Sequence, residues 1–200
     1  PSEAAFIDEP YRSYVKAAIN LRYALLPYNY TLAYNQTKKG TPLVAPLYYY
    51  YPNDTSAMNI GDEFMWGENI LVAPVLEKGA KQRNIYLPEG IWYDLKALSD
   101  PSLTYQTHKG NFITELKNEA IPVYVKAGSF IPMIEKPEGT NTSKYSLKEF
   151  TINYYADKKA SAYDLFYDDG VTKQSIANRQ FEIVSFKAAP GNQKLTFTVS

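Results

Sequence analysis

Residues 21–34 read LRYALLPYNYTLAY and lie inside a longer helical pattern. Apolar residues recur at helical spacing from Pro10 to about Lys38, which predicts helix over this range, and the proline at its start suits a first helical turn. Gly40 suits a stop just past the end of the helix. Pro27 lies within the pattern, where it removes a backbone hydrogen bond and clashes with the preceding turn. We therefore predict two helical segments on one path, with a bend or break near Leu26.

The next segment, LVAPLYYYY over residues 43–51, is apolar on both faces. Pro42 precedes it, and the turn-forming residues 52–54 follow it. An apolar run of this length between turn signals is typical of a buried strand. A helix followed by such a strand is the pattern of one unit of an α/β barrel.

After DEFMWG, residues 62–67, the sequence changes to short strand-like runs separated by turn residues. The runs are 70–75, 84–87, 91–95, 112–116, 121–125 and 129–134. Gly79, the triplet 88–90 and the pair 127–128 supply the breaks between them. This spacing predicts an antiparallel β-sandwich.

Residues 136–144 combine Pro, Gly, Asn, Thr and Ser without a long apolar side chain, which predicts a linker. Beyond it, four segments are strand-like: 150–155, 163–167, 181–186 and 195–199. The triplet Asp168-Asp169-Gly170 signals a tight turn after the second of these segments. We expect a small all-β domain here that Ser200 cuts short. No repeat of fixed period favours a solenoid or a propeller.

Composition excludes several classes of function. The 200 residues carry 21 basic and 21 acidic side chains, so no net positive field would attract nucleic acid. No apolar run approaches the roughly 20 residues that cross a bilayer, and the first residues lack a signal-peptide pattern. We therefore expect neither a nucleic-acid nor a membrane partner, and a chain cut from a longer protein. The absence of cysteine excludes disulfides but leaves the compartment open.

Three adjacent acidic pairs are candidates for acid–base chemistry, and each has a structural alternative. Asp168 and Asp169 precede Gly170, so we expect them to accept backbone hydrogen bonds in a solvated turn, with a cation site or a domain contact as alternatives. The pair 62–63 is expected to cap a short helix. The pair 8–9 is expected to start the helix at Pro10, although loops that feed barrel helices also line ligand sites.

The remaining motifs carry little chemistry. His108 is the only histidine, so a multi-histidine metal site is excluded, and its neighbours predict an exposed loop. No phosphate-binding loop or zinc-protease motif occurs, and we expect no metal or cofactor. Of four Asn-x-Ser/Thr sequons, only the last, in the linker, is a candidate glycan site: Asn29, Asn35, Asn53 and Asn141.

Residues 21–34 resemble the last barrel helix of glycoside hydrolase family 31. Three further blocks follow in the order of that family: 46–54, 62–75 and 85–94. Residues 127–133, AGSFIPM, resemble its closing sandwich strand, and 165–170, LFYDDG, resemble a hairpin of its distal β-domain. The resemblance covers nearly the whole chain and is weakest after about Gln174. One departure is Ala45, where many relatives have Arg before Pro-Leu.

The resemblance implies a mainly β chain in four parts. These are the last helix and strand of the (β/α)8 barrel (1–62), a proximal C-terminal β-sandwich (63–136), a linker (137–144) and a distal C-terminal β-domain (145–200). It further implies an intact enzyme that is a retaining, exo-acting hydrolase of α-linked glucosides or xylosides. In that family the aspartate nucleophile, the aspartate acid/base and the substrate-binding His and Arg lie upstream of Pro1, so we carry over no catalytic, cofactor-binding or metal residue.

The expected partners are the remainder of the barrel and, through it, an oligosaccharide substrate. Trp66 and Trp92 are predicted to bury apolar area where the sandwich supports the barrel helix and strand. Nineteen tyrosines and nine phenylalanines leave two other functions open. A carbohydrate-binding module would show exposed coplanar rings, and a pure interaction domain would lack a polar-aromatic cleft.

Overall fold

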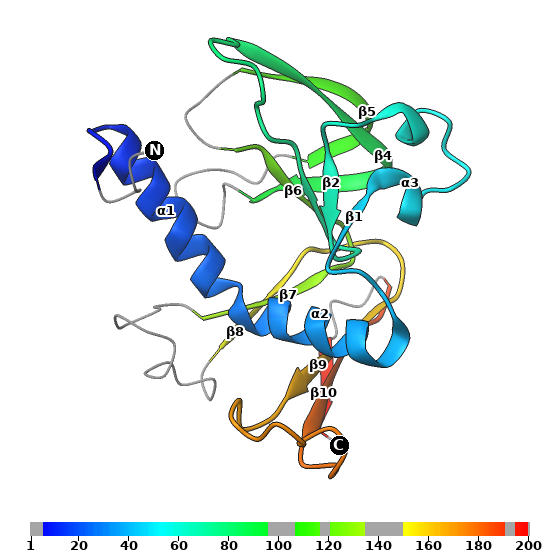
Figure 1. Cartoon of the computed structure of the whole chain (residues 1–200). Helices are drawn as coiled ribbons and strands as arrows, with labels where there is room; N and C mark the ends of the chain where they lie inside the picture. Colours follow the sequence, from blue (N-terminus) through cyan, green and yellow to red (C-terminus); the bar gives the residue numbers. More distant parts are fainter. Residues whose placement is uncertain (1–5, 96–106, 117–120, 135–149, 191–194, 200) are drawn as a thin grey trace.

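The computed structural model describes residues 6–95, 107–116, 121–134, 150–190 and 195–199. These residues form mainly antiparallel β structure, with the two long helices near the N-terminal end (Figure 1), which confirms the predicted fold class. No helix in these ranges is both long and apolar enough to cross a membrane. The predicted linker and Asn141 lie outside the described residues.

The helical region divides near Leu26, as the position of Pro27 predicts. Helix α1 spans Tyr11–Ala24 and helix α2 spans Leu26–Lys39, with Pro27 in the first turn of α2. Gly40 ends α2 in the left-handed conformation, with φ of 70°, and its amide donates to the carbonyl of Gln36 at 2.9 Å. Both the break and the stop are thus confirmed.

The prediction of one buried strand over residues 43–51 is wrong. Strand β1 covers only Val44–Pro46, and the short helix α3 follows at Leu47–Tyr50. Pro46 lacks an N–H for a longer ladder, and its φ of −64° suits the residue that precedes a helix. Tyrosine-rich runs fit strand and helix equally well by periodicity, so the pattern alone could not separate the two.

Six strands form the largest sheet, in the order β1-β2-β3-β6-β4-β5, and every neighbouring pair is antiparallel. A 3₁₀ turn, η2 (Ala57–Asn59), lies between α3 and β2 in the sequence. After β1, the strands of this sheet are β2 (Phe64–Trp66), β3 (Ile70–Val72), β4 (Gln82–Asp94), β5 (Thr107–Leu116) and β6 (Val123–Lys126).

The predicted break at residues 88–90 is instead a bulge within one long strand. Leu87 pairs with Asn111 and Ile91 with Lys109, so three residues of β4 oppose the single residue Gly110. A side chain at Gly110 could not fit, because its Cβ would lie 2.4 Å from the carbonyl oxygen of Pro88. The strand therefore continues across a Pro-Glu-Gly triplet that local turn rules assign to a break.

Two smaller sheets complete the fold. Strand β7 (Phe130–Met133) pairs with β8 (Thr151–Tyr154), and β9 (Ser161–Tyr167), β10 (Glu182–Ala188) and β11 (Leu195–Val199) form an antiparallel sheet in the order β11-β10-β9. Helix α2 contacts both β7 and β9. In Figure 1 it lies below the six-stranded sheet and above β9 and β10.

Strand β3 is buried on both faces and divides the core into two clusters. Leu71 points into a cluster with Leu47 of α3 and Trp92 of β4. Its neighbours Ile70 and Val72 point the other way, into a cluster that contains Leu25 and Tyr28 at the start of α2, because successive strand residues face opposite sides. The six-stranded sheet is therefore covered by α3 on one face and by α2 on the other.

Trp92 is fully buried in the first cluster, and its indole N–H donates to the carbonyl of Pro88 in the bulge at 2.8 Å. Replacement of this side chain by alanine removes that bond and leaves a large cavity. We expect Trp92→Ala to lower the free energy of unfolding by ~3 kcal/mol or more, measured by urea denaturation. Phe6→Ala is the matched control, because Phe6 is 75% exposed. A near-zero loss for Trp92→Ala would contradict the packing role.

Gly110 provides a second test of the bulge. Gly110→Ala would push a methyl group into the backbone at Pro88, so the ladder between β4 and β5 must shift and the melting temperature should fall by several degrees. At Gly61, a Cβ would meet no atom within 4 Å, so Gly61→Ala is the control and should change little. Equal melting temperatures for the two variants would show that the bulge is not rigid.

Candidate functional site

The junction between α2 and the β2–β3 turn is held by polar contacts as well as by apolar packing. Tyr28 is fully buried, and its hydroxyl donates to the carbonyl of Trp66 at 2.8 Å. The indole N–H of Trp66 donates to Oδ1 of Asn29 at 2.7 Å. Gly67 has φ of 62°, and a Cβ there would lie 2.4 Å from the Tyr28 hydroxyl. Trp66, which was predicted to bury apolar area, is half-buried and packs against the second core cluster.

The same helix also binds the strand and turn near residue 168. Asp168 is only 6% exposed, and its carboxylate accepts hydrogen bonds from the Tyr30 hydroxyl at 2.7 Å, the Gly170 amide at 2.8 Å and the Ser175 hydroxyl at 2.6 Å. Burial, and then the bond to Asp168, raise the pKa of Tyr30 to about 12. The predicted turn role is confirmed, but Asp168 is not solvated as predicted and joins α2 to the turn.

Asp169 has the solvated turn role that the sequence predicts. It is exposed and accepts the amides of Val171 and Thr172 at 3.0 and 2.8 Å, and its hydrogen bonds to Thr172 lower its pKa. A hollow of about 300 Å³ lies beside this turn, lined by Tyr30, Tyr34 and Phe166 among others. The rings of Tyr34 and Phe166 stack at 4.2 Å with planes 10° apart, and Phe166 is buried.

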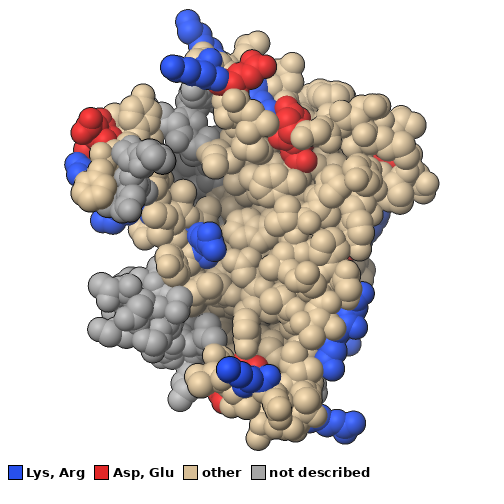
Figure 2. Space-filling model, in the orientation of Figure 1, with Lys and Arg blue, Asp and Glu red and all other residues tan. Residues whose placement is uncertain are grey.

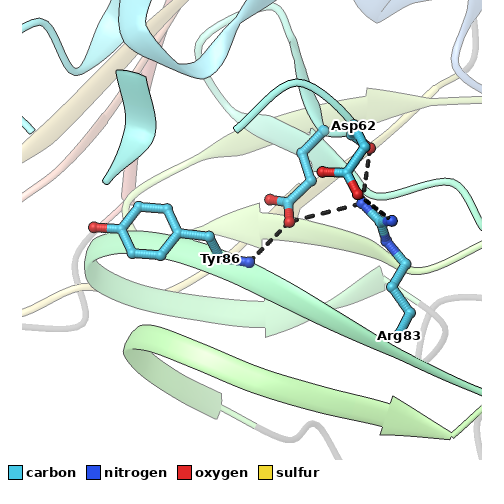
Figure 3. Close-up of polar contacts among 4 residues, drawn as sticks. Asp62, Arg83 and Tyr86 are labelled. Atoms are coloured by element: carbon cyan, nitrogen blue, oxygen red, sulfur yellow. Dashed lines mark hydrogen bonds and ion pairs between the residues drawn. The ribbon is translucent and has the colours of Figure 1, made fainter. Parts of the chain in front are cut away.

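Asp62 and Glu63 do not cap a helix, because strand β2 follows them directly, so the predicted capping role is wrong. Arg83 of β4 holds both residues (Figure 3): its guanidinium donates to the Asp62 carboxylate and to the Asp62 carbonyl, each at 2.7 Å. Glu63 is 5% exposed, and its Oε1 accepts the Tyr86 amide at 2.8 Å and lies 3.7 Å from Arg83 Nη2.

Glu63 has an unusual electrostatic setting. Burial raises the pKa of its carboxyl to about 7, although the Tyr86 amide and the Arg83 charge act in the opposite direction. Its second oxygen, Oε2, is buried without a hydrogen-bond partner among the described residues. Arg83, which sequence reasoning missed, lies 20 residues further along the chain than Glu63, and no local signal links the two.

The other candidates have structural roles. Glu9 starts helix α1 as predicted, because its carboxylate accepts the amide and hydroxyl of Ser13 at 3.3 and 2.7 Å and pairs with Arg12 at 3.0 Å. The bond to Ser13 and then the bond to Arg12 lower the pKa of Glu9. Asp8 is exposed, and its carbonyl accepts the Arg12 amide. None of these contacts resembles a carboxylate pair set across an open cleft.

His108 does not lie in a loop as predicted. It belongs to β5, opposite Trp92 of β4, and its ring meets Tyr124 edge-on at 5.5 Å. No group of three or more possible metal ligands occurs among the described residues. On the face drawn in Figure 2, charged side chains are few and scattered, apart from several Lys and Arg along the right-hand edge.

Asp54 is an acidic residue that sequence reasoning assigned only to a turn. Its Oδ1 accepts the amides of Ser56 and Ala57 at the start of η2, and its Oδ2 accepts the Tyr86 hydroxyl at 2.6 Å. The bond to Tyr86 is the main cause that lowers the pKa of Asp54. The preceding sequon residue, Asn53, is exposed in a turn.

The described part of the chain is thus a β-rich region in which helix α2 joins three sheets and the acidic pairs hold the fold together. Residues 40–131 match the glycosyl hydrolase family 31 C-terminal domain. The chain belongs to this family and corresponds to the C-terminal region of glucosidase-type enzymes.

Known relatives agree along most of the chain. It is 30% identical to the lysosomal alpha-glucosidase of Rattus norvegicus, over 94% of this chain and 21% of the relative, and 31% identical to the alpha-glucosidase of Hordeum vulgare, over 90% and 20%. The fold matches a family 31 dextranase of Flavobacterium johnsoniae at 29% identity and a TM-score of 0.81, over 94% of this chain and 23% of that chain. The chain therefore spans about a fifth of the length of these relatives.

The raised pKa of Glu63 predicts that the free energy of unfolding falls as the pH rises. Because the folded-state pKa of about 7 exceeds the ordinary value of 4.5, the folded chain binds this proton more tightly than the unfolded chain. The resulting stability is complete below about pH 4.5 and is lost as pH rises through 7. Between pH 5 and 8, the free energy of unfolding should fall relative to Glu63→Gln by roughly 3 kcal/mol, measured by urea denaturation. Parallel pH curves for the two proteins would contradict this.

Proposed function

We propose that this chain is the non-catalytic supporting region of a retaining family 31 glycoside hydrolase that cleaves terminal α-glucosides or α-xylosides. The proposal divides the chain as the resemblance does, into barrel end (1–62), proximal sandwich (63–136), linker (137–144) and distal domain (145–200). The two catalytic aspartates would belong to barrel strands that precede these residues. The compartment stays open.

The anchoring of α2 is the observation that carries this proposal. This helix, which resembles the last barrel helix, binds the β2–β3 turn through Tyr28 and Asn29 and the distal turn through Tyr30. Two strand pairs also cross the proposed divisions, β1 with β2 and β7 with β8. A helix fixed from two sides can hold the neighbouring barrel wall in place, which is what a supporting region must do.

The substrate class rests on the relatives. Among solved structures, an alpha-xylosidase of Xanthomonas citri matches at 25% identity and a TM-score of 0.82, over 93% of this chain and 19% of that chain. Together with the alpha-glucosidases, this match supports an α-glycosidic bond to glucose or xylose as the target. Retention of configuration would require two carboxyl groups about 5 Å apart, which the missing barrel must supply.

The alternative of a carbohydrate-binding module receives less support. Two exposed tyrosines, Tyr11 and Tyr49, meet the neighbouring rings of Tyr14 and Tyr50 at 82° and 78°, so neither pair offers a flat platform for a sugar. The coplanar pair Tyr34 and Phe166 instead packs α2 against β9. Inward-facing rings favour the supporting role.

The first experiment is hydrolysis of an aryl α-glucoside and an aryl α-xyloside by this chain and by a longer chain that restores the whole barrel. We expect turnover only by the longer chain, with a product whose anomeric configuration, followed by NMR, matches that of the substrate. Turnover by the 200-residue chain would place catalytic carboxylates within it and overturn the proposal.

A variant of the longer chain tests whether the contact between Trp66 and α2 affects stability or the catalytic step. Trp66→Phe removes the indole N–H that binds Asn29 and keeps most of the ring, so it should speed thermal inactivation while leaving low-temperature kcat and KM nearly unchanged. Tyr48→Phe, at an exposed ring, is the control. A large change in kcat without loss of stability would argue against a purely supporting role.

A further inference from the structure

Helix α1 carries an apolar stripe that is packed at one end and exposed at the other. Four residues recur at spacings of three and four and so lie on one side of the helix: Tyr11, Tyr14, Ala18 and Leu21. At the inner end, Leu21 packs against the second core cluster, next to the fully buried Leu25. At the outer end, Tyr11 is 64% exposed, and Ala18 is exposed as well. The stripe therefore continues the core outward, and its outer half is open to solvent.

Only the C-terminal end of α1 is fixed firmly to the described residues. Ala24 is the one buried residue of this helix, and its carbonyl accepts the Ile134 amide at 2.8 Å. At the other end, the ion pair between Glu9 and Arg12 is exposed and adds little stability. In Figure 1 the N-terminal half of α1 lies apart from the labelled strands. A helix of 14 residues is marginal in water without tertiary packing, so the outer half of α1 needs a partner surface.

We infer that the outer half of this stripe is an interface with the part of the enzyme that precedes the C-terminal domain, and that apolar side chains of that part cover Tyr11 and Ala18. The family match begins at residue 40, directly after α2, so α1 lies on the upstream side of the matched domain. This chain spans only 21% of the rat relative, so most of such an enzyme is available to supply the cover. The inference rests on the proposed function, because it takes that larger part to be present.

The residues around the stripe fit a close apolar contact. Ala18 carries no long side chain, so a partner element can approach the helix backbone there, with apolar area from Tyr11 and from Ile19, which is 43% exposed, on either side. Arg22, one turn after Ala18, can lay its aliphatic stem along the partner and keep its charge at the edge. The opposite side of the helix is polar and suits water: Ser13, Lys16 and Asn20. Because the stripe continues a core cluster, its cover extends the core of one polypeptide rather than joining two copies of this chain.

Hydrogen exchange followed by mass spectrometry tests the cover and needs no variant. In this chain, amides 14–20 should exchange quickly, because the outer half of α1 can open without disturbing the core. In the full-length enzyme the same amides should exchange at least about 100-fold more slowly. Amides 28–31 of α2 are the internal control, since they lie at the core and should be protected in both proteins. Equal exchange of amides 14–20 in the two proteins would overturn the inference. Protection in this chain that grows with its concentration would also overturn it, because a second copy would then cover the stripe.

Two variants of α1 provide a second test. Ala18→Gln places a longer polar side chain in the proposed interface, whereas Asn20→Gln places one on the opposite side, because two helical residues span about 200°. In the full-length enzyme, Ala18→Gln should raise the rate of thermal inactivation at least about fivefold, and Asn20→Gln should leave it nearly unchanged. In this chain neither variant should move the midpoint of urea denaturation, because both positions are exposed. Equal inactivation rates for the two full-length variants would show that Ala18 is not covered.

The hydrolysis assay decides the proposed function separately. Turnover by a full-length enzyme whose α1 amides stay unprotected would overturn only the interface. Protected α1 amides in a full-length protein that cleaves neither aryl glycoside would support the interface and overturn the proposed substrate class.

Discussion

The close approach of Tyr28 to Gly67 is the constraint on which the rest of the structure depends. The hydroxyl of Tyr28 reaches the backbone of the β2–β3 turn only because residue 67 has no side chain and adopts a positive φ. At this point α2 covers one face of the six-stranded sheet, and Ile70 and Val72 pack beneath it. A larger residue at position 67 would lift the helix and open the second core cluster. The position of α2 relative to the sheet therefore depends on the lack of a side chain at Gly67.

The same helix carries the attachment of the small β9–β11 sheet. Thr31 is fully buried, and its hydroxyl accepts the Phe166 amide at 3.2 Å. The neighbouring Tyr30 donates to Asp168, two residues further along the chain than Phe166. Because β9 is an edge strand, the Phe166 amide is free of the ladder on that side and can bond to the helix. Two β regions are thus positioned by successive residues of α2. Movement of the helix would therefore disturb both regions together.

Sequence reasoning succeeded where a local rule decides the structure. Pro27 and Gly40 set the helix boundaries through backbone geometry alone, and the Asp-Asp-Gly turn followed from side-chain bonds to nearby amides. It failed where a distant residue decides. Tyr30 is 138 positions from Asp168, and Glu63 is 23 positions from the amide of Tyr86, so the sequence could not show that these acids are buried. The bulge at 88–90 depends on Gly110 in the facing strand, which a turn rule does not consider.

The acidic residues show why the number of carboxylates in a sequence says little about catalysis. Asp168 and Glu63 are equally well buried, but their surroundings differ. Three donors surround Asp168, so it binds elements together as a satisfied acceptor. Glu63 receives one close donor and keeps one buried oxygen without a partner among the described residues, so burial raises its pKa. A perturbed acid near a hollow is a common mark of an active site, yet the only other acid among the residues that line the hollow next to β1 is Asp62, which is bound to Arg83.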